Sequence, residues 1–332
     1  MDRCEPLRMV TFHLNQVGDM LFSLPALLSL RAGFPGAHLT AVVRPYLVQL
    51  VQMSGLVDAV IPRPKGNPLA KVRLGLQLRN NRFHVAVSFS QAAECVLLTW
   101  LTGAAVRVGF KGERLSGLFS IHAEKVGPPS TANNLRLVQA IGCPVVQTTY
   151  VGLVKPSAED EADAERLLHQ AGVSLQRPIV VLGPGTSGRQ SIKQWPAERF
   201  GAIADYLVRK GAQVLLMGTS REMESLRGLT QSVVDLSGRT TLPVAAAVLK
   251  RARLFVGVDS GLMHLAAAVG TRCVALFGPT DPRLTGPHGQ GHEILRIDLQ
   301  CSPCLRKKCR LGRECMLGLS VETVIQAIEK VW

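Results

Sequence analysis

Three polar residues interrupt an otherwise apolar stretch in the last third of the chain. Residues 254–258 are apolar throughout, which predicts a parallel strand buried on both faces, and apolar residues recur at helical spacing over 262–269. Asp259, Ser260 and Gly261 therefore lie between a strand end and a helix start, where open α/β folds bind ligands. The amide groups of a first helical turn attract phosphate, Ser260 adds a hydroxyl donor, and Gly261 lets a ligand approach the backbone.

The roles of the side chains around this turn differ. Asp259 repels a phosphate because both are negative, so it is better suited to a sugar hydroxyl or to holding the loop amides. Asp259 or Ser260 could equally cap the following helix, and this stretch alone leaves the alternative open. His264 follows about one helical turn later, and both a ligand contact and a buried core histidine remain open for it.

A second polar turn follows the apolar residues 178–183. Gly185, Thr186 and Ser187 offer backbone and hydroxyl donors, and Lys193 offers a cation on a loop expected to face solvent; together they meet the needs of a diphosphate. The turn is neither a Walker loop nor a G-x-G-x-x-G fingerprint, which disfavours nucleotide hydrolysis and nicotinamide binding. A loop without chemistry is the alternative.

The first half of the chain places Gly18 and Asp19 at the corresponding turn, after a predicted strand over 9–15. A carboxylate there can accept the proton of an acceptor hydroxyl as it attacks, which is general-base catalysis. The alternative is that Asp19 is a helix N-cap, for which Asp is among the best residues.

Strands and helices alternate along both halves, which predicts parallel sheets covered on both faces. Strands are expected at 9–15, 39–43, 59–61, 85–89, 106–109, 178–183, 214–217, 233–236, 254–258 and 274–277, and helices at 20–32, 69–78, 92–101, 200–210, 222–231, 244–251, 262–269 and 321–331. The expected fold is α/β, with two facing Rossmann-like, doubly wound domains, residues 1–155 and 156–332, and a central cleft. The last helix could close the second domain or cross back to the first.

Length, composition and charge narrow the class of protein. The chain has 332 residues, of which 47% are hydrophobic, and its net charge of +14 favours anionic partners such as phosphorylated substrates, acidic lipid or nucleic acid. No nucleic-acid-binding motif is present, so a nucleic-acid partner is not expected. With no run of roughly 20 apolar residues and no signal segment, a cytoplasmic protein is expected.

Four of the eight cysteines cluster near the C-terminus, at Cys301, Cys304, Cys309 and Cys315. Their number matches the ligand count of a zinc or iron–sulfur site, but we favour reduced thiols on a loop; disulfides are a further alternative under oxidising conditions. No strand ends in an Asp-x-Asp pair that could hold Mg²⁺ against a diphosphate. No metal or other cofactor is therefore expected.

An ordered set of motifs resembles glycosyltransferase family 9, the ADP-heptose:lipopolysaccharide heptosyltransferases. The motifs are GDMLFSLPAL from Gly18, KQWP from Lys193, GVDSGLMHLA from Gly257 and FGPTD from Phe277. The resemblance implies a B-type glycosyltransferase fold and an inverting, metal-independent reaction. It makes Asp19 the base, Lys193 with Thr186 and Ser187 the diphosphate stabilisers, and Asp259, Ser260 and Gly261 the donor grip. It also implies an acidic residue near the ribose, Glu222, with Glu224 as the fallback.

The resemblance further implies transfer of a heptose from ADP-heptose to the inner core of lipopolysaccharide, with the protein peripheral at the cytoplasmic face of the inner membrane. The N-terminal domain, with Gly18 and Asp19, would bind the acceptor, and the C-terminal domain would bind the donor. Another nucleotide-sugar transferase of the same fold is the nearest alternative. A non-enzymatic basic protein that binds anionic lipid or nucleic acid is the alternative from a different class.

Overall fold

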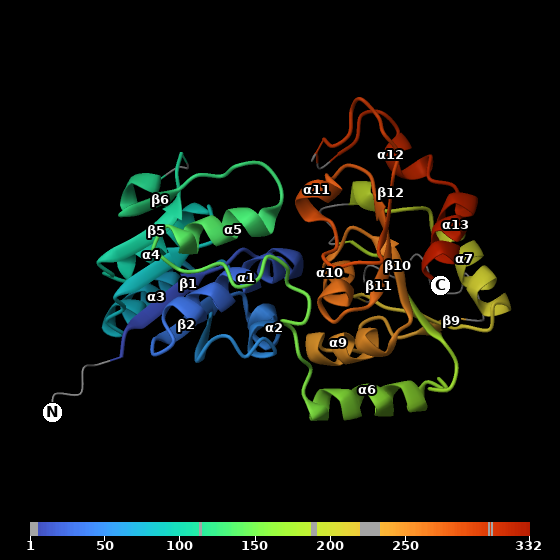
Figure 1. Cartoon of the computed structure of the whole chain (residues 1–332), viewed down its shortest axis with the longest axis horizontal. Coiled ribbons are helices and arrows are strands. Elements are labelled where there is room, and N and C mark those ends of the chain that lie inside the picture. The colour runs from blue at the N-terminus through green and yellow to red at the C-terminus, as the bar shows by residue number, and fades with distance from the viewer. Residues whose placement is uncertain (1–5, 113–114, 187–190, 220–232, 305, 307) are drawn as a thin grey trace. The chain divides into compact units, whose positions relative to one another are not determined.

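The chain forms two compact units, residues 1–153 and 154–332 (Figure 1). The computed structural model describes all residues except 1–5, 113–114, 187–190, 220–232, 305 and 307. Each unit is an α/β domain built on one parallel six-stranded sheet.

The sheet of the first unit has the strand order β3-β2-β1-β4-β5-β6, and all its strands are parallel. The strands are β1 (Arg8–Phe12), β2 (His38–Val43), β3 (Ala59–Pro62), β4 (Val85–Ser88), β5 (Val106–Phe110) and β6 (Ile121–Ala123). The apolar, largely buried strands fit a sheet that is covered by helices on both faces.

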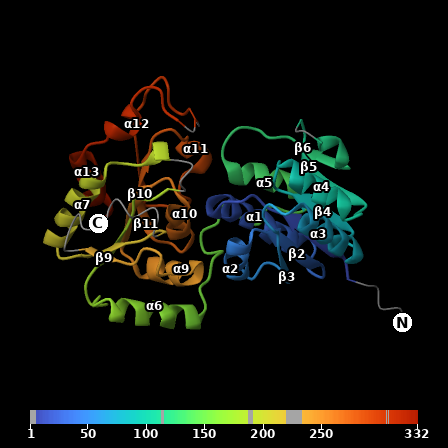
Figure 2. The same cartoon turned by 180° about the vertical axis from the view of Figure 1, so that it is seen from behind.

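Helices flank this sheet on both sides (Figures 1 and 2). They are α1 (Val17–Gly33), α2 (Val48–Gln52), α3 (Pro68–Asn80), α4 (Ala93–Leu101) and α5 (Ser130–Gln139), with short 3-10 turns at η1 (Pro45–Leu47) and η2 (Ser116–Leu118). Leu74 and Leu78 of α3 pack with Leu98 of α4 on Val10 and Phe12 of β1. Helices α1 and α5 pack against each other.

The second unit repeats the arrangement with the order β12-β11-β10-β7-β8-β9. Its strands are β7 (Ile179–Gly183), β8 (Gln213–Leu216), β9 (Val233–Asp235), β10 (Leu254–Val258), β11 (Arg272–Phe277) and β12 (Glu293–Arg296). Its helices are α6 (Ala158–Gln170), α7 (Ala197–Arg209), α9 (Leu242–Arg251), α10 (Gly261–Ala268), α11 (Pro282–Thr285), α12 (Glu314–Leu317) and α13 (Val321–Val331), with a 3-10 turn at η3 (Ser191–Lys193).

The last helix belongs to the second unit. Helix α13 packs against α7, β11 and β12, and Val324 and Ile328 are fully buried in the core that it shares with them. Of the two positions open from the sequence, α13 therefore takes the one that closes the second domain. Within the described residues, no helix combines the length and apolar character needed to cross a bilayer.

The predicted α/β class with two parallel, doubly wound sheets is confirmed. The bounds of β10 and α13 match the expected ranges 254–258 and 321–331. The short strands β6 and β12 were missed because each offers only three or four residues of pattern. The helix expected at 222–231 lies outside the described residues, and the central cleft between the domains stays a prediction.

Both sheets reverse their strand order next to the turns singled out in the sequence. In the first sheet the reversal lies between β1 and β4, and in the second between β7 and β10. Ligands of open parallel sheets bind outside the carboxyl ends of the strands at such points. The turn after β1 leads into the first turn of α1, which carries Asp19, and the turns after β7 and β10 carry Thr186 and Asp259.

Two glycines allow β7 and β10 to approach each other at the reversal point of the second sheet. Gly183 and Gly257 face each other in register. A Cβ atom at Gly257 would lie 2.4 Å from the Gly183 carbonyl oxygen and 2.7 Å from the Phe255 ring. Both distances are shorter than real contacts allow, so these strands require glycine here.

We expect Gly257→Ala to lower the free energy of unfolding by about 2 kcal/mol or more, because the added methyl group overpacks a site walled by backbone and an aromatic ring. Urea unfolding followed by circular dichroism measures the change. Gly36→Ala is the control, since its Cβ would meet nothing within 4 Å, and it should stay within about 0.5 kcal/mol of the parent. Equal stability of the two variants would contradict the steric account.

Candidate functional site

A buried ion pair lies at the carboxyl edge of the second sheet. Lys193 Nζ is 2.8 Å from Asp259 Oδ2, and the two residues are 9% and 5% exposed. His264 Nε2 lies 3.6 Å from the other carboxylate oxygen, Oδ1, and His264 is itself buried. The structure thus brings together three of the predicted site residues, from η3, the β10–α10 turn and α10.

The environment of Asp259 keeps it ionised. Burial alone would raise the pKa of this carboxyl, but the neighbouring His264 side chain and the charge of Lys193 outweigh burial and lower the pKa to about 2. Asp259 is therefore an anion at neutral pH with a cation on one oxygen and an imidazole on the other.

The expectation that Lys193 faces solvent was wrong. Its ammonium group turns inward because the Asp259 carboxylate offers an opposite charge at the sheet edge, where burial strengthens the attraction. Lys193 is the last residue of the 3-10 turn η3.

Ser260 is the N-cap of α10. Its backbone is extended, and its hydroxyl oxygen accepts the Met263 N–H at 3.4 Å. The capping alternative therefore holds for Ser260, whereas Asp259 pairs with Lys193. Because the cap uses an oxygen lone pair, the Ser260 hydroxyl proton can still be donated to a ligand. Gly261 is the first residue of the helix, so its amide is among the unpaired donors of the first turn.

The turn after β7 is described only in part. Gly185 and Thr186 follow the strand and are both buried. Ser187 lies outside the described residues, as do Glu222 and the fallback Glu224.

In the first unit, Asp19 is the third residue of α1 and is half-buried, next to the buried Gly18. The N-cap is Gln16, whose side chain makes no capping hydrogen bond, so the alternative that Asp19 is the N-cap was wrong. A carboxylate in the first turn still interacts favourably with the helix dipole.

A network of arginines lies beside this turn. Arg63 is 1% exposed, and its Nη2 donates to Asn15 Oδ1 at 2.5 Å while its Nη1 lies 2.9 Å from Glu94 Oε1. Arg44 Nε donates to the same Asn15 oxygen at 3.1 Å, and Lys71 Nζ lies 3.3 Å from Glu94 Oε2. Two arginines thereby hold the loop that leads from β1 to Asp19.

Charges in this network influence one another. Burial would raise the pKa of the Glu94 carboxyl, but the hydrogen bonds and charges of Arg63 and Lys71 lower it overall. Burial also raises the pKa of the nearby Tyr46 phenol, and the charge of Asp19 adds to this rise. Asp19 therefore lies within electrostatic range of the groups around Tyr46.

His13 is held as a neutral side chain. Its ring nitrogens lie 2.9 Å from the hydroxyls of Ser23 and Thr11, and its ring stacks on Phe89 at 5.0 Å. Burial, followed by the charge of Arg63, lowers the pKa of His13 to about 3. At neutral pH this imidazole is a weak base, so it is a poor candidate for the proton acceptor.

The sequence pattern alone did not predict the arginine network, although it contains one indication of it. Arg44 and Arg63 each follow the last residue of a strand, at the ends of β2 and β3, as Asp259 follows β10. Polar residues at this position reach the carboxyl edge of the sheet. The tie between Arg63 and Glu94 joins residues 31 positions apart, and only the fold reveals it.

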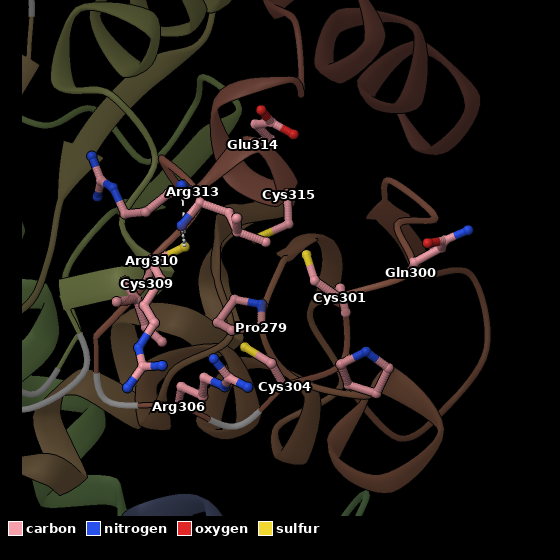
Figure 3. Close-up of a pocket in the computed structure, with 14 residues that line it drawn as sticks. Pro279, Gln300, Cys301, Cys304, Arg306, Cys309, Arg310, Arg313, Glu314 and Cys315 are labelled. Atoms are coloured by element: carbon pink, nitrogen blue, oxygen red, sulfur yellow. Dashed lines mark hydrogen bonds between the residues drawn. The ribbon is translucent and has the colours of Figure 1, made fainter.

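The clustered cysteines line one pocket of about 340 Å³, together with Ile192 and three arginines (Figure 3). Cys301, Cys304, Cys309 and Cys315 are all free thiols. In the part of the chain that the structure describes, no three Cys, His, Asp or Glu side chains are arranged to hold a metal ion.

The sequence of the chain matches a family model and the sequences of known proteins. Residues 71–314 match the model of a family described as glycosyltransferase family 9 (heptosyltransferase). Lipopolysaccharide heptosyltransferase 2 of Escherichia coli K12 is 25% identical over 311 residues, which cover 85% of each chain.

Solved structures share the fold over nearly the whole chain. A glycosyl transferase family 9 protein from Veillonella parvula aligns with a TM-score of 0.84 at 21% identity and covers 98% of this chain and 97% of that one. E. coli heptosyltransferase WaaC with ADP aligns with a TM-score of 0.75 at 22% identity over 98% and 100% of the two chains.

The buried ion pair predicts non-additive stability. Lys193→Met and Asp259→Asn should each lower the free energy of unfolding by about 3 kcal/mol, because each leaves the partner without its matching group in a buried site. The double variant should lose less than the sum of the two. Urea unfolding at pH 7 measures all three, with Lys250→Met of the exposed Lys250–Glu161 pair as the near-neutral control. Additive losses would mean that the two groups do not interact.

The same ion pair sets a pH dependence. Because folding lowers the pKa of Asp259 from 3.8 to about 2, its contribution of about 2 kcal/mol is fully present above pH 4 and is lost as the pH falls toward 2. The wild type should therefore lose more stability than the double variant between pH 5 and pH 3. Parallel losses in the two proteins would contradict the lowered pKa.

Proposed function

The chain belongs to glycosyltransferase family 9, whose model matches residues 71–314, and from this premise we propose that it transfers a heptose from ADP-heptose to the inner core of lipopolysaccharide. The resemblance predicted from the ordered motifs is confirmed, and the chain is a glycosyltransferase. This removes the non-enzymatic alternative. The donor, the acceptor and a metal-independent, inverting course are parts of the proposal.

One observation carries the proposal: the buried Lys193–Asp259–His264 cluster stands beside the N-terminus of α10 at the reversal point of the second sheet. A diphosphate bound there would meet the amides of the first helical turn, the Ser260 hydroxyl and the Lys193 ammonium group. ADP bound to the WaaC protein, which shares this fold, supports a donor of the same kind. We therefore assign the donor to the second unit.

Asp259 acts through Lys193 in this proposal. Since its two oxygens face Lys193 and His264, the carboxylate orients the ammonium group for the diphosphate. As the bond to the sugar breaks, negative charge grows on the diphosphate oxygen, and a preoriented cation stabilises that charge without reorganisation. The Lys193 ammonium group would thus stabilise the leaving diphosphate, as a divalent metal ion does in other transferases.

The acceptor is assigned to the first unit, where Asp19 is the proposed base. Asp19 takes the proton of the acceptor hydroxyl while the hydroxyl oxygen forms a bond to the anomeric carbon and ADP leaves from the opposite side. Such a single displacement inverts the anomeric centre. The acceptor is anionic and membrane-bound, and residues 1–153 hold 15 Lys and Arg against 7 Asp and Glu, which supports an assignment at the inner membrane face.

Nucleotide binding tests the donor assignment. ADP at about 100 times its dissociation constant should stabilise the fold by roughly 2.7 kcal/mol, and UDP and GDP at the same concentration should stabilise it less. Thermal unfolding with each nucleotide, with and without EDTA, measures this. A larger shift with UDP or GDP would redirect the donor, and a shift that EDTA removes would contradict the metal-independent course.

Asp19→Asn tests the base. Asn cannot take up the proton, so turnover should fall by at least roughly 10²-fold, while ADP binding stays normal. Stability should fall by no more than about 1 kcal/mol, the usual worth of a first-turn carboxylate. The measurement is ADP release from ADP-heptose and acceptor, with Glu124→Gln, an exposed carboxylate of the same unit, as the control. Near-normal turnover in Asp19→Asn would remove Asp19 from the mechanism.

A further inference from the structure

Helix α3 is apolar on two opposite faces. Leu74 and Leu78 point into the core of the first unit. Leu69, Val72 and Leu76 are 71%, 57% and 60% exposed. Because their spacing of three and four residues places them on one side of a helix, they form a continuous outer stripe. A helix that is apolar on both faces is ordinarily covered on both, so the outer stripe of α3 indicates a partner.

Helix α4 extends this apolar surface. Its Leu97 and Trp100 are 43% and 50% exposed. The two helices lie side by side, since a Cβ at Gly75 of α3 would be 2.9 Å from Leu101 Cδ1 of α4 (Figures 1 and 2). We call the exposed Leu69, Val72, Leu76, Leu97 and Trp100 the α3–α4 surface.

Positive charge borders this surface. Residues 63–82 contain six Lys and Arg and no Asp or Glu. Two of the six, Arg63 and Lys71, face Glu94. The other four are exposed: Lys65, Arg73, Arg79 and Arg82. Arg73 is one residue after Val72, and Arg79 is three residues after Leu76. This spacing places the two arginines on opposite sides of the apolar stripe of α3.

We propose that the α3–α4 surface docks on a bilayer that contains anionic lipid. Aliphatic side chains and a tryptophan between rows of arginine and lysine match the interface between headgroups and acyl chains, where indole rings and long cationic side chains are favoured. A single tryptophan among aliphatic side chains offers no row of aromatic rings on which successive nucleic acid bases could stack. The proposal rests on the proposed function for its purpose, since docking would bring the first unit to a membrane-bound acceptor.

Vesicle binding tests the docking without any substrate. The full-length protein is sedimented with vesicles of phosphatidylcholine, or of phosphatidylcholine with phosphatidylglycerol. Leu69→Gln/Val72→Gln/Leu76→Gln should lower the partition coefficient at least tenfold on anionic vesicles. Val145→Gln/Val146→Gln is the matched control, because these residues are 42% and 51% exposed elsewhere in the same unit, and it should bind like the wild type.

The charges can be tested separately. Arg73→Gln/Arg79→Gln should lower binding to anionic vesicles by roughly 25-fold, at about fivefold for each cation near the surface, and should leave binding to neutral vesicles unchanged. Circular dichroism checks that each variant is folded. Equal losses on neutral and anionic vesicles would remove the charge part of the proposal.

Trp100 reports which surface enters the bilayer. Lipids brominated near the headgroup end of the acyl chains should quench part of the tryptophan fluorescence of the wild type. That quenching should disappear in Trp100→Phe. Quenching that persists in Trp100→Phe would place the contact on another surface and overturn the proposal.

Two further measurements distinguish membrane docking from self-association, and failure of the docking proposal from failure of the proposed function. Sedimentation velocity tests whether the wild type self-associates. If it does, and if the triple Gln variant abolishes this self-association but leaves vesicle binding unchanged, the surface binds a second copy of the chain and the docking proposal is overturned. Turnover on an acceptor without acyl chains should be normal in the triple variant. Failure of vesicle binding with such turnover intact overturns the docking alone, whereas absence of turnover in the wild type overturns the proposed function.

Discussion

The buried attraction between Lys193 and Asp259 is the constraint on which the second unit's site depends. It joins the 3-10 turn η3 to the turn after β10, and the two paired residues are 66 positions apart in the chain. A lysine in a buried position requires an anion, and a buried carboxylate requires a cation. Each charge therefore makes the burial of the other tolerable, and in the proposed function the pair holds the cation that would stabilise the leaving diphosphate.

The first unit uses the same principle with different residues. Glu94 is surrounded by Arg63, Arg44 and Lys71 and leaves an excess of positive charge. Arginine suits this network, because its planar fork can bind Asn15 and Glu94 at once, which an ammonium group does less well. In each unit a partly or fully buried carboxylate therefore ties together segments at the carboxyl edge of the sheet, and in the second unit the paired lysine is the one that we propose to contact the diphosphate.

The sequence predicted the fold class and the central strands because buried parallel strands are continuous apolar runs. It also indicated that Lys193, Asp259 and His264 lie near the carboxyl edge of the second sheet, since each belongs to a segment that follows a strand end or to the helix after it. It failed on the direction of the Lys193 side chain, because an opposite charge from a distant turn decides this direction. The Arg63–Glu94 contact escaped for the same reason. Patterns along the chain are enough to locate the turns. Ion pairs between turns can be identified only once the packed sheet shows which turns are neighbours.

The facing glycines of β7 and β10 have a consequence for how this enzyme could diversify. With Phe255 packed against Gly183 and Gly257, the floor of the candidate site in the second unit is backbone. A side chain introduced at either glycine would overlap the Phe255 ring, and one at Gly257 would also overlap the Gly183 carbonyl oxygen. Evolution therefore has no graded way to reshape that floor. If the proposed donor site is correct, changes of nucleotide or sugar preference must arise in the segments that follow the strands, where residues can be exchanged while the sheet beneath them stays the same.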